Sequence, residues 1–332
     1  MLGKKVDAKI LITGASGFIG RRLRDALLDA GADVVSIRRA GSPESKRGRS
    51  AVADYADLDG LRRLIAAEKP DLVFHVAGAT KGVTYADFHR ANVMPTKNLL
   101  EALSREHDRL ARFVHVSSLT SYGPSTPERP HVESDPREPI EFYGQSKLEA
   151  EVVVESYGDR LPWTIVRPGG VYGPGDVDYF NLFKLVSQGF NFYFGNRQRW
   201  FSAIYVDDCV RATVDAALSP ATKGKGYFLC DGRPITWEQF QQLIIEKHGK
   251  RVRDVDFPEV LVDFAALGAE LITRIDKKPR LFNRQKAKMG AQKAWTCTHR
   301  AAQSDFGYTP EVATEDGIRQ SLAWYREQGW IR

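Results

Sequence analysis

The stretch Thr13-Gly14-Ala15-Ser16-Gly17-Phe18-Ile19-Gly20 decides the fold of this chain. It follows Lys9–Ile12, which reads as a buried strand, and it leads into a segment whose apolar residues recur at helical spacing until Gly31. Glycines three residues apart between a strand and a helix let the backbone approach a pyrophosphate, which then meets the positive helix end. The alternative is a plain strand-helix turn. We expect a dinucleotide-binding loop.

Strands and helices alternate through the first half of the chain. Residues 57–68 have helical apolar spacing, and the segments that read as further strands are 33–37, 71–76, 113–116 and 163–166. Such alternation indicates an α/β fold with a Rossmann-type, doubly wound parallel sheet. After about residue 167, turn clusters and aromatic residues replace this pattern. We predict a dinucleotide-binding domain at 1–167, its sheet completed by parts of 168–232, and a smaller, mainly substrate-binding lobe at 168–332.

The composition is that of a soluble globular protein, with 42% apolar and 27% charged residues among 332. The net charge is +6, but the basic residues are scattered, so we expect no nucleic-acid partner. Cys209, Cys230 and Cys297 show no metal or disulfide spacing, which favours no metal and a reducing, cytoplasmic location. No apolar run is long enough for a spanning helix, and the polar start predicts no signal peptide.

Tyr143-Gly144-Gln145-Ser146-Lys147 carries the chemistry. A tyrosine and a lysine four residues apart lie on one face of a helix, where the ammonium can lower the pKa of the phenol from its usual value near 10. Tyr143 is the only one of the 12 tyrosines with lysine at that spacing. Together with the glycine loop, this pair predicts redox chemistry with a nicotinamide cofactor.

Ser117 and Ser118 follow the strand at 113–116, at the sheet edge where ligands of such folds bind. A hydroxyl there can hold a carbonyl oxygen beside Tyr143, although tandem serines also serve as caps or turns. We predict that Ser118, Tyr143 and Lys147 form the catalytic set.

The end of the second strand indicates which cofactor binds. A site for NAD has an acidic residue there, which bonds the ribose hydroxyls. This chain has Arg38, followed by Arg39, and a guanidinium suits the 2′-phosphate of NADP. A surface charge pair is the alternative. We expect NADP(H), with NAD(H) as the second choice, and we expect Asp54 with Tyr55 to hold the adenine.

Four other polar positions are weaker candidates. His75 and His115 lie in apolar strands and read as satisfied core histidines rather than catalysts. Asn92 opens a helix that ends near residue 101, and it is a candidate for fixing local backbone or a water. Asp207-Asp208 reads as a helix N-terminus rather than a metal pair.

Taken in order, these motifs resemble the extended short-chain dehydrogenase/reductases. The landmarks are Thr13–Gly20, His75–Gly78, Val116–Ser118, Tyr143–Lys147, Arg167–Pro174 and Tyr205–Asp208, which cover nearly the whole chain. The resemblance implies that Ser118, Tyr143 and Lys147 are the catalytic trio and that Lys147 also holds the nicotinamide ribose. It implies that Pro168–Val171 borders the nicotinamide, and by analogy it implies a homodimer.

The complete set of expected binding residues follows from the motifs and this resemblance. For the cofactor they are Gly14, Ser16, Gly17, Phe18, Ile19, Gly20, Arg38, Arg39, Asp54, Tyr55, Ala77, Gly78, Ala79, Asn92, Tyr143, Lys147, Pro168, Gly170 and Val171. For the substrate they are Thr80, Ser118, Tyr143, Gly169, Phe192 and Trp200.

The C-terminal third is similar to the 3β-hydroxysteroid dehydrogenase-like branch, through 260–275, Pro279–Arg284, Ala301–Pro310 and Trp324-Tyr325. That branch usually has an acidic residue where Arg38 stands, which is a departure. The rival nucleotide-sugar epimerases and dehydratases typically carry an arginine where Phe201 stands, although Arg197 and Arg199 are near. The aromatic residues between 179 and 205 favour an apolar substrate, unless they are ordinary core.

These observations predict an NADP(H)-dependent enzyme that interconverts a ketone and a secondary alcohol on an apolar, sterol-like or long-chain substrate. The alternative is a nucleotide-sugar 4-epimerase or dehydratase, and the third reading is a non-catalytic protein that senses NADP(H). Residues 260–275 have a strong apolar helical stripe, which would cover the substrate pocket or make a peripheral membrane contact.

Overall fold

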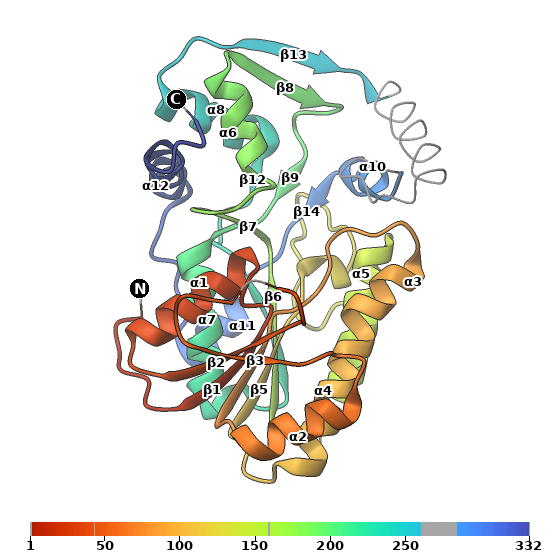
Figure 1. The fold of residues 1–332 in the computed structure, drawn as a ribbon. Coiled ribbons are helices and arrows are strands. Elements are labelled where there is room, and N and C mark those ends of the chain that lie inside the picture. The colour runs from red at the N-terminus through yellow and green to blue at the C-terminus, as the bar shows by residue number, and fades with distance from the viewer. Residues whose placement is uncertain (1, 43, 159, 260–283, 332) are drawn as a thin grey trace.

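A seven-stranded parallel sheet forms the centre of the molecule (Figure 1), in the order β11-β6-β5-β4-β1-β2-β3. The structure, a computed structural model, describes residues 2–42, 44–158, 160–259 and 284–331. The strands are β1 (Lys9–Thr13), β2 (Asp33–Arg38), β3 (Arg49–Val52), β4 (Leu72–His75), β5 (Arg112–Val116), β6 (Trp163–Pro168) and β11 (Lys225–Leu229). The strand order reverses beside β1, so a ligand crevice is expected at its carboxyl end.

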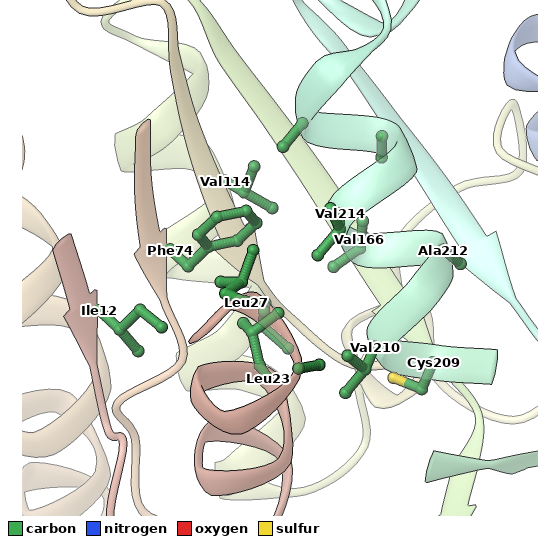
Figure 2. Packing of buried hydrophobic residues seen from close by; sticks show 14 of the residues in the cluster. Ile12, Leu23, Leu27, Phe74, Val114, Val166, Cys209, Val210, Ala212 and Val214 are labelled. Atoms are coloured by element: carbon green, nitrogen blue, oxygen red, sulfur yellow. The ribbon is translucent and has the colours of Figure 1, made fainter. Parts of the chain in front are cut away.

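Helices cover both faces of this sheet. One face carries α1 (Phe18–Asp29), α7 (Val206–Leu218) and α11 (Arg300–Phe306), and the other carries α2 (Leu58–Glu68), α4 (Met94–Glu106) and α5 (Phe142–Glu155). Figure 2 shows Leu23 and Leu27 of α1 against Phe74 and Val114 of the sheet. Strands that are buried on both sides are continuous apolar runs in the sequence, so their positions could be predicted from it. The predicted α/β Rossmann-type fold is confirmed.

The remaining elements form the lobe above the carboxyl end of the sheet (Figure 1). Its strands are β7 (Gly170–Tyr172), β8 (Phe190–Phe194), β9 (Trp200–Phe201), β10 (Ala203–Tyr205), β12 (Ile235–Thr236), β13 (Arg253–Phe257) and β14 (Ala294–Trp295). Its helices are α6 (Phe180–Ser187), α8 (Trp237–His248), α10 (Arg284–Gly290) and α12 (Thr314–Glu327). Because the chain returns from the lobe to supply β11, the two regions are interleaved. Their division into two functional domains stays a prediction.

The predicted aromatic cluster divides into core and surface. Tyr179, Phe183, Phe201 and Tyr205 belong to the lobe's hydrophobic core, as the ordinary-core alternative predicts, whereas β8 exposes part of its side chains. The predicted helix at 260–275 lies outside the described residues. Within the described part of the chain, no helix is long and apolar enough to cross a bilayer.

The helix expected to open at Asn92 starts differently. The short α3 (Tyr85–Phe88) runs into a π-helical turn, η1 (His89–Val93), which contains Asn92, and α4 begins only at Met94. A π turn widens the backbone spiral by one residue and is often found at functional sites. The expected start was therefore wrong by two residues, because local spacing does not reveal this turn.

Candidate active site

Glycines allow the loop after β1 to pack closely against its neighbours. A Cβ atom on Gly14, whose φ is +71°, would lie 2.6 Å from the amide nitrogen of Ala77, and one on Gly20 would lie 2.1 Å from the carbonyl oxygen of Gly14. Gly17 is exposed and starts α1, whose first turn carries no acidic side chain. The first amides of a helix have no internal partner, so this open end suits a pyrophosphate.

A pocket of about 590 Å³ opens at the carboxyl end of β2 and β3. Its polar lining comes from Arg39, Asp54, Asp57 and Arg63, and it matches the place expected for the adenosine half of a dinucleotide. Arg39 is exposed, whereas Arg38 does not line the pocket.

Arg38 is held by the loop that follows its strand. Its guanidinium donates hydrogen bonds to the carbonyl of Ser42 at 3.1 Å and to the hydroxyl of Ser50 at 3.4 Å. Of the two arginines, Arg39 therefore lines this pocket and Arg38 does not. Spacing alone could not separate the two, because one acceptor lies in the loop after β2 and the other in β3.

Tyr55 lies under the glycine loop rather than in the adenosine pocket. Its phenol lies near the side chain of Thr13 and the backbone of Gly14, and burial raises its pKa to about 12. Tyr55 therefore does not line this pocket, whereas Asp54 does, and the contacts of both residues with adenine stay predictions.

Asn92 joins the segment after β4 to helix α5. Its amide oxygen accepts from the amide of Ala79 at 2.6 Å, and its amide nitrogen donates to the carbonyl of Ala79 at 3.1 Å and to the Ser146 hydroxyl at 2.8 Å. A Cβ atom on Gly78 would lie 2.9 Å from the Asn92 amide oxygen. Of the two roles expected for Asn92, the structure shows the fixing of local backbone.

The three predicted catalytic residues meet at the carboxyl end of β5. Helix α5 begins with Glu141 as its cap, whose carboxylate accepts from the amides of Tyr143 at 2.7 Å and Gly144 at 2.6 Å, and this places Tyr143 in the first turn. The Ser118 hydroxyl lies near enough to the phenol of Tyr143 to lower its pKa. One turn further, the ammonium of Lys147 donates to the carbonyl of Val116 at 2.7 Å.

The pKa values at this site are set mainly by burial. Burial raises the pKa of Tyr143 to about 12, the nearby charge of Glu141 adds to that rise, and the Ser118 hydroxyl opposes it. Burial lowers the pKa of Lys147 to about 8, against the opposing effect of Glu151. The expected lowering of the Tyr143 pKa by Lys147 is wrong for this structure, because the ammonium bonds the strand end and burial dominates at the phenol.

A buried carboxylate that the sequence reasoning missed holds the site together. Glu151 is fully buried one turn after Lys147, and it accepts from Arg167 at 2.9 and 3.1 Å and from the hydroxyl groups of Ser117 and Ser121. Burial acts to raise its pKa, but Arg167 and the two hydroxyls outweigh burial and lower it. Its position four residues after Lys147 was the available signal.

A small pocket lies directly beside Tyr143. Its other lining residues are Thr80, Lys81, Phe88, Glu141, Gln285 and Lys286. Of these, only Thr80 was predicted. The Gln285 side-chain oxygen accepts from the amide of Phe142 at 3.2 Å, so α10 is seated against the start of α5. Because α10 lies about 140 residues later in the chain, no local pattern could place it there.

Comparison with known proteins agrees with this geometry. Residues 10–229 match the NAD dependent epimerase/dehydratase family, which is two thirds of the chain. The chain belongs to this family.

Several relatives match along nearly the whole chain, and two of them are named as reductases. A 2-alkyl-3-oxoalkanoate reductase of Stenotrophomonas maltophilia is 29% identical, covering 95% of this chain and 98% of that protein. A 4-hydroxy-2-methyl-3-oxo-4-farnesyl-3,4-dihydroquinoline-1-oxide ketoreductase of Stigmatella aurantiaca is 27% identical, covering 93% and 94%. Among solved structures, UDP-glucose 4-epimerase from Thermotoga maritima has a TM-score of 0.80 at 23% identity, covering 96% of this chain and 99% of that one, which shows a shared fold.

Some of the residues that we predicted to bind the substrate do not line the small pocket beside Tyr143. Phe192 packs against Phe257 on the ribbon of β8 and β13, and Trp200 lies in β9 beside β14; neither lines the pocket at Tyr143. A Cβ atom on Gly169 would lie 2.4 Å from the Ser202 carbonyl, so Gly169 lets Pro168–Val171 pass close to β10. The structure thus brings Thr80 and Tyr143 together, but not Phe192 or Trp200.

The two strand histidines differ. His75 is satisfied as predicted, with ring nitrogens 2.7 Å from the Thr13 hydroxyl and 2.9 Å from the Thr96 hydroxyl. His115 is equally buried but has no hydrogen-bond partner on either nitrogen, so the expectation that it is satisfied was wrong. Its strand neighbours on either side are apolar or already bonded.

Asp207 and Asp208 lie at the start of α7, as expected for a helix N-terminus. Asp208 accepts from the amides of Glu311 and Val312 at 2.9–3.1 Å, and Asp207 bonds Arg22. Among the described residues, no group of three or more metal-ligating side chains converges.

Proposed function

We propose that this chain is an NADP(H)-dependent oxidoreductase that interconverts a ketone and a secondary alcohol on an apolar, long-chain or sterol-like substrate. Membership of the family makes the chain an enzyme that uses a pyridine nucleotide. The preference for NADP(H) and the apolar ketone substrate are what we propose. The observation that carries the proposal is the meeting of Ser118, Tyr143 and Lys147 at the sheet edge, beside an open glycine loop.

The hydrogen bonds around Ser118 indicate how a carbonyl would be held. The Ser118 oxygen accepts from the Thr120 amide at 3.2 Å and from the Thr120 hydroxyl at 3.0 Å. With those acceptor positions used, its own proton is left to donate toward the phenol or a substrate carbonyl. In this proposal, Ser118 orients the carbonyl and stabilises charge that develops on its oxygen.

Tyr143 would give the proton in the reductive direction. A phenol with a pKa near 12 is protonated at neutral pH, so the acid form is the resting form. Lys147 keeps its positive charge near the reacting oxygen and would hold the nicotinamide ribose. A reduced nicotinamide, when bound, supplies the hydride.

Arg39 supports the preference for NADP(H). It is exposed and lines the adenosine pocket together with Arg63, so two guanidinium groups border the place proposed for a 2′-phosphate. Asp54 and Asp57 also line the pocket; Asp54 suits the amino group of adenine, and Asp57 caps α2.

Two observations bear on the substrate class. Two of the relatives that match along nearly the full length are named as reductases of a 2-alkyl-3-oxoalkanoate and of a farnesylated ketone, and another is named as a UDP-glucose 4-epimerase. Arg197 and Arg199, the arginines available to grip a sugar diphosphate, are ion-paired with Asp256 and Glu259. These ion pairs favour an apolar ketone over a nucleotide sugar.

A ketone panel followed at 340 nm tests the proposal. We expect steady NADPH oxidation with long-chain 3-oxo acids or sterol ketones, and faster oxidation of NADPH than of NADH. Steady turnover would also exclude a pure sensor. In parallel, UDP- and dTDP-sugars should not raise the melting temperature. Strong stabilisation by those sugars, with every ketone inert, would favour the epimerase alternative.

The homodimer and the closeness to the 3β-hydroxysteroid dehydrogenase-like branch stay predictions. Sedimentation velocity of the purified protein tests the first. Turnover of 3β-hydroxysteroids with NADP tests the second.

A further inference from the structure

Strands β8 and β13 form a two-stranded parallel ribbon at the outer end of the lobe (Figure 1). Side chains alternate between the two faces of a strand. Along β8, Asn191 and Tyr193 are buried, whereas Phe190 and Phe194 are 43% and 53% exposed. The ribbon therefore turns its phenylalanines outward, which is the reverse of the usual burial of aromatic residues.

The register of the ribbon defines the outward surface. Phe190 pairs with Arg253, Phe192 with Val255, and Phe194 with Phe257. We call these six residues the outer ribbon face. Phe194 stacks on Phe257 at 5.3 Å between ring centroids, and Phe192 meets Phe257 edge-on at 5.5 Å, so the rings are continuous.

The acidic residues of the ribbon lie on its other face. Asp254 accepts from the Asn191 side chain at 3.0 Å, and Asp256 accepts from Arg197, whose guanidinium lies 3.9 Å from the Tyr193 ring centroid. The alternation that turns the phenylalanines outward thus removes both carboxylates from the outer ribbon face. Its only charged member is the cation Arg253.

Further cations border the same face. Lys250 and Arg251, just before β13, are exposed like Arg253, and neither arginine forms an ion pair within the described part of the chain. Exposed aromatic groups beside unpaired cations match the interface of an anionic bilayer, where rings enter the acyl boundary and cations meet the headgroups.

We propose that the outer ribbon face docks this protein on an anionic lipid surface. The proposal goes beyond the reductase function and does not depend on it. A protein partner would ordinarily be matched by mixed charges and hydrogen-bonding groups, whereas the outer ribbon face offers apolar side chains and one cation, with no carboxylate. An anionic lipid surface fits that chemistry best.

Co-sedimentation of the full chain with vesicles tests the proposal. We expect binding to mixed phosphatidylcholine–phosphatidylglycerol vesicles, weakened by salt, and little binding to pure phosphatidylcholine. Phe190→Ser/Phe194→Ser and, separately, Arg251→Glu/Arg253→Glu should each reduce binding by about tenfold or more.

Matched controls separate the face from general changes in polarity and charge. Val152→Ser/Leu218→Ser removes two other exposed apolar residues, and Arg90→Glu/Arg319→Glu makes an equal charge change elsewhere; both should bind vesicles like the wild type. NADPH affinity should be unchanged in all four variants, which keeps this test apart from that of the reductase function.

Several outcomes would overturn the proposal. One is the absence of wild-type binding to the anionic vesicles, and another is equal binding by the wild type and the Arg251→Glu/Arg253→Glu variant. The arginine variant keeps the apolar residues, so it tests the proposal even when the phenylalanine variant does not fold. A concentration-dependent dimer that Phe190→Ser/Phe194→Ser abolishes would assign the face to a second copy instead.

Discussion

The ammonium of Lys147 donates a hydrogen bond to the carbonyl of Val116 at 2.7 Å, which ties helix α5 to the end of strand β5. This bond holds the cation at the sheet edge, within one helical turn of Tyr143. Because burial lowers the pKa of Lys147 to about 8, its charge is the one that changes within the working pH range.

The first prediction concerns the pH dependence of ketone reduction. Tyr143, with a pKa of about 12, stays protonated, so the acid is present throughout. Lys147 loses its proton as pH rises through about 8. We expect kcat/KM to be level below that pH and to fall above it, and Lys147→Arg, if active, to lack the fall. A kcat/KM that climbs through pH 8 would contradict this assignment.

The second prediction concerns cofactor choice. Arg39→Ala should raise the Kd of NADPH by about 10- to 100-fold, because a charge-assisted hydrogen bond contributes about 1.5–3 kcal/mol. The Kd of NADH should change little. Fluorescence titration of both cofactors measures this, with Arg90→Ala as a control at a distant exposed arginine. Equal losses for NADPH and NADH would show that Arg39 does not contact the 2′-phosphate.

The third prediction concerns His115, which is buried without hydrogen bonds. Burial, together with the charges of Lys147 and Arg167, holds its pKa well below 6.5, so unfolding takes up a proton as the pH falls below that value. The free energy of unfolding therefore falls as the pH drops below 6.5, by about 2 kcal/mol between pH 7 and 5 for one such histidine.

His115→Phe should remove that part of the acid loss without breaking a hydrogen bond. Urea unfolding at both pH values measures the free energy of unfolding, with the half-exposed His89→Phe as the control. The same acid loss in wild type and His115→Phe would mean that His115 is not held neutral.

The fourth prediction concerns Glu151. Glu151→Gln leaves the Arg167 guanidinium buried without its carboxylate, which should cost about 3–5 kcal/mol of the free energy of unfolding. Glu155→Gln, on the same helix but partly exposed, should cost under about 1 kcal/mol. Chemical denaturation compares the two, and equal small losses would show that the buried pair contributes little.

The sequence revealed those parts of the site that depend on local spacing. The glycine loop, the strand that leads to Ser118 and the helical pair of Tyr143 and Lys147 each lie within one short segment. Their residue patterns can therefore be recognised in the sequence. The parallel sheet was legible because strands buried on both faces are continuously apolar.

The rest depends on contacts between distant segments. His115 has no partner only because of what β4 and β6 place around it, and Gln285 reaches the start of α5 from the far end of the chain. Arg38 donates hydrogen bonds to Ser42 and Ser50, whereas Arg39 lines the pocket. The pKa of Tyr143 likewise depends on burial, which spacing does not report.

The most direct test of the central claim is ketone turnover by Tyr143→Phe. We expect this variant to bind NADPH as the wild type does and to lose kcat by about 10²- to 10⁴-fold, because the proton donor is gone. Tyr157→Phe, whose hydroxyl bonds Glu101 away from the site, should keep full activity. Near wild-type turnover by Tyr143→Phe with an active ketone would contradict the account.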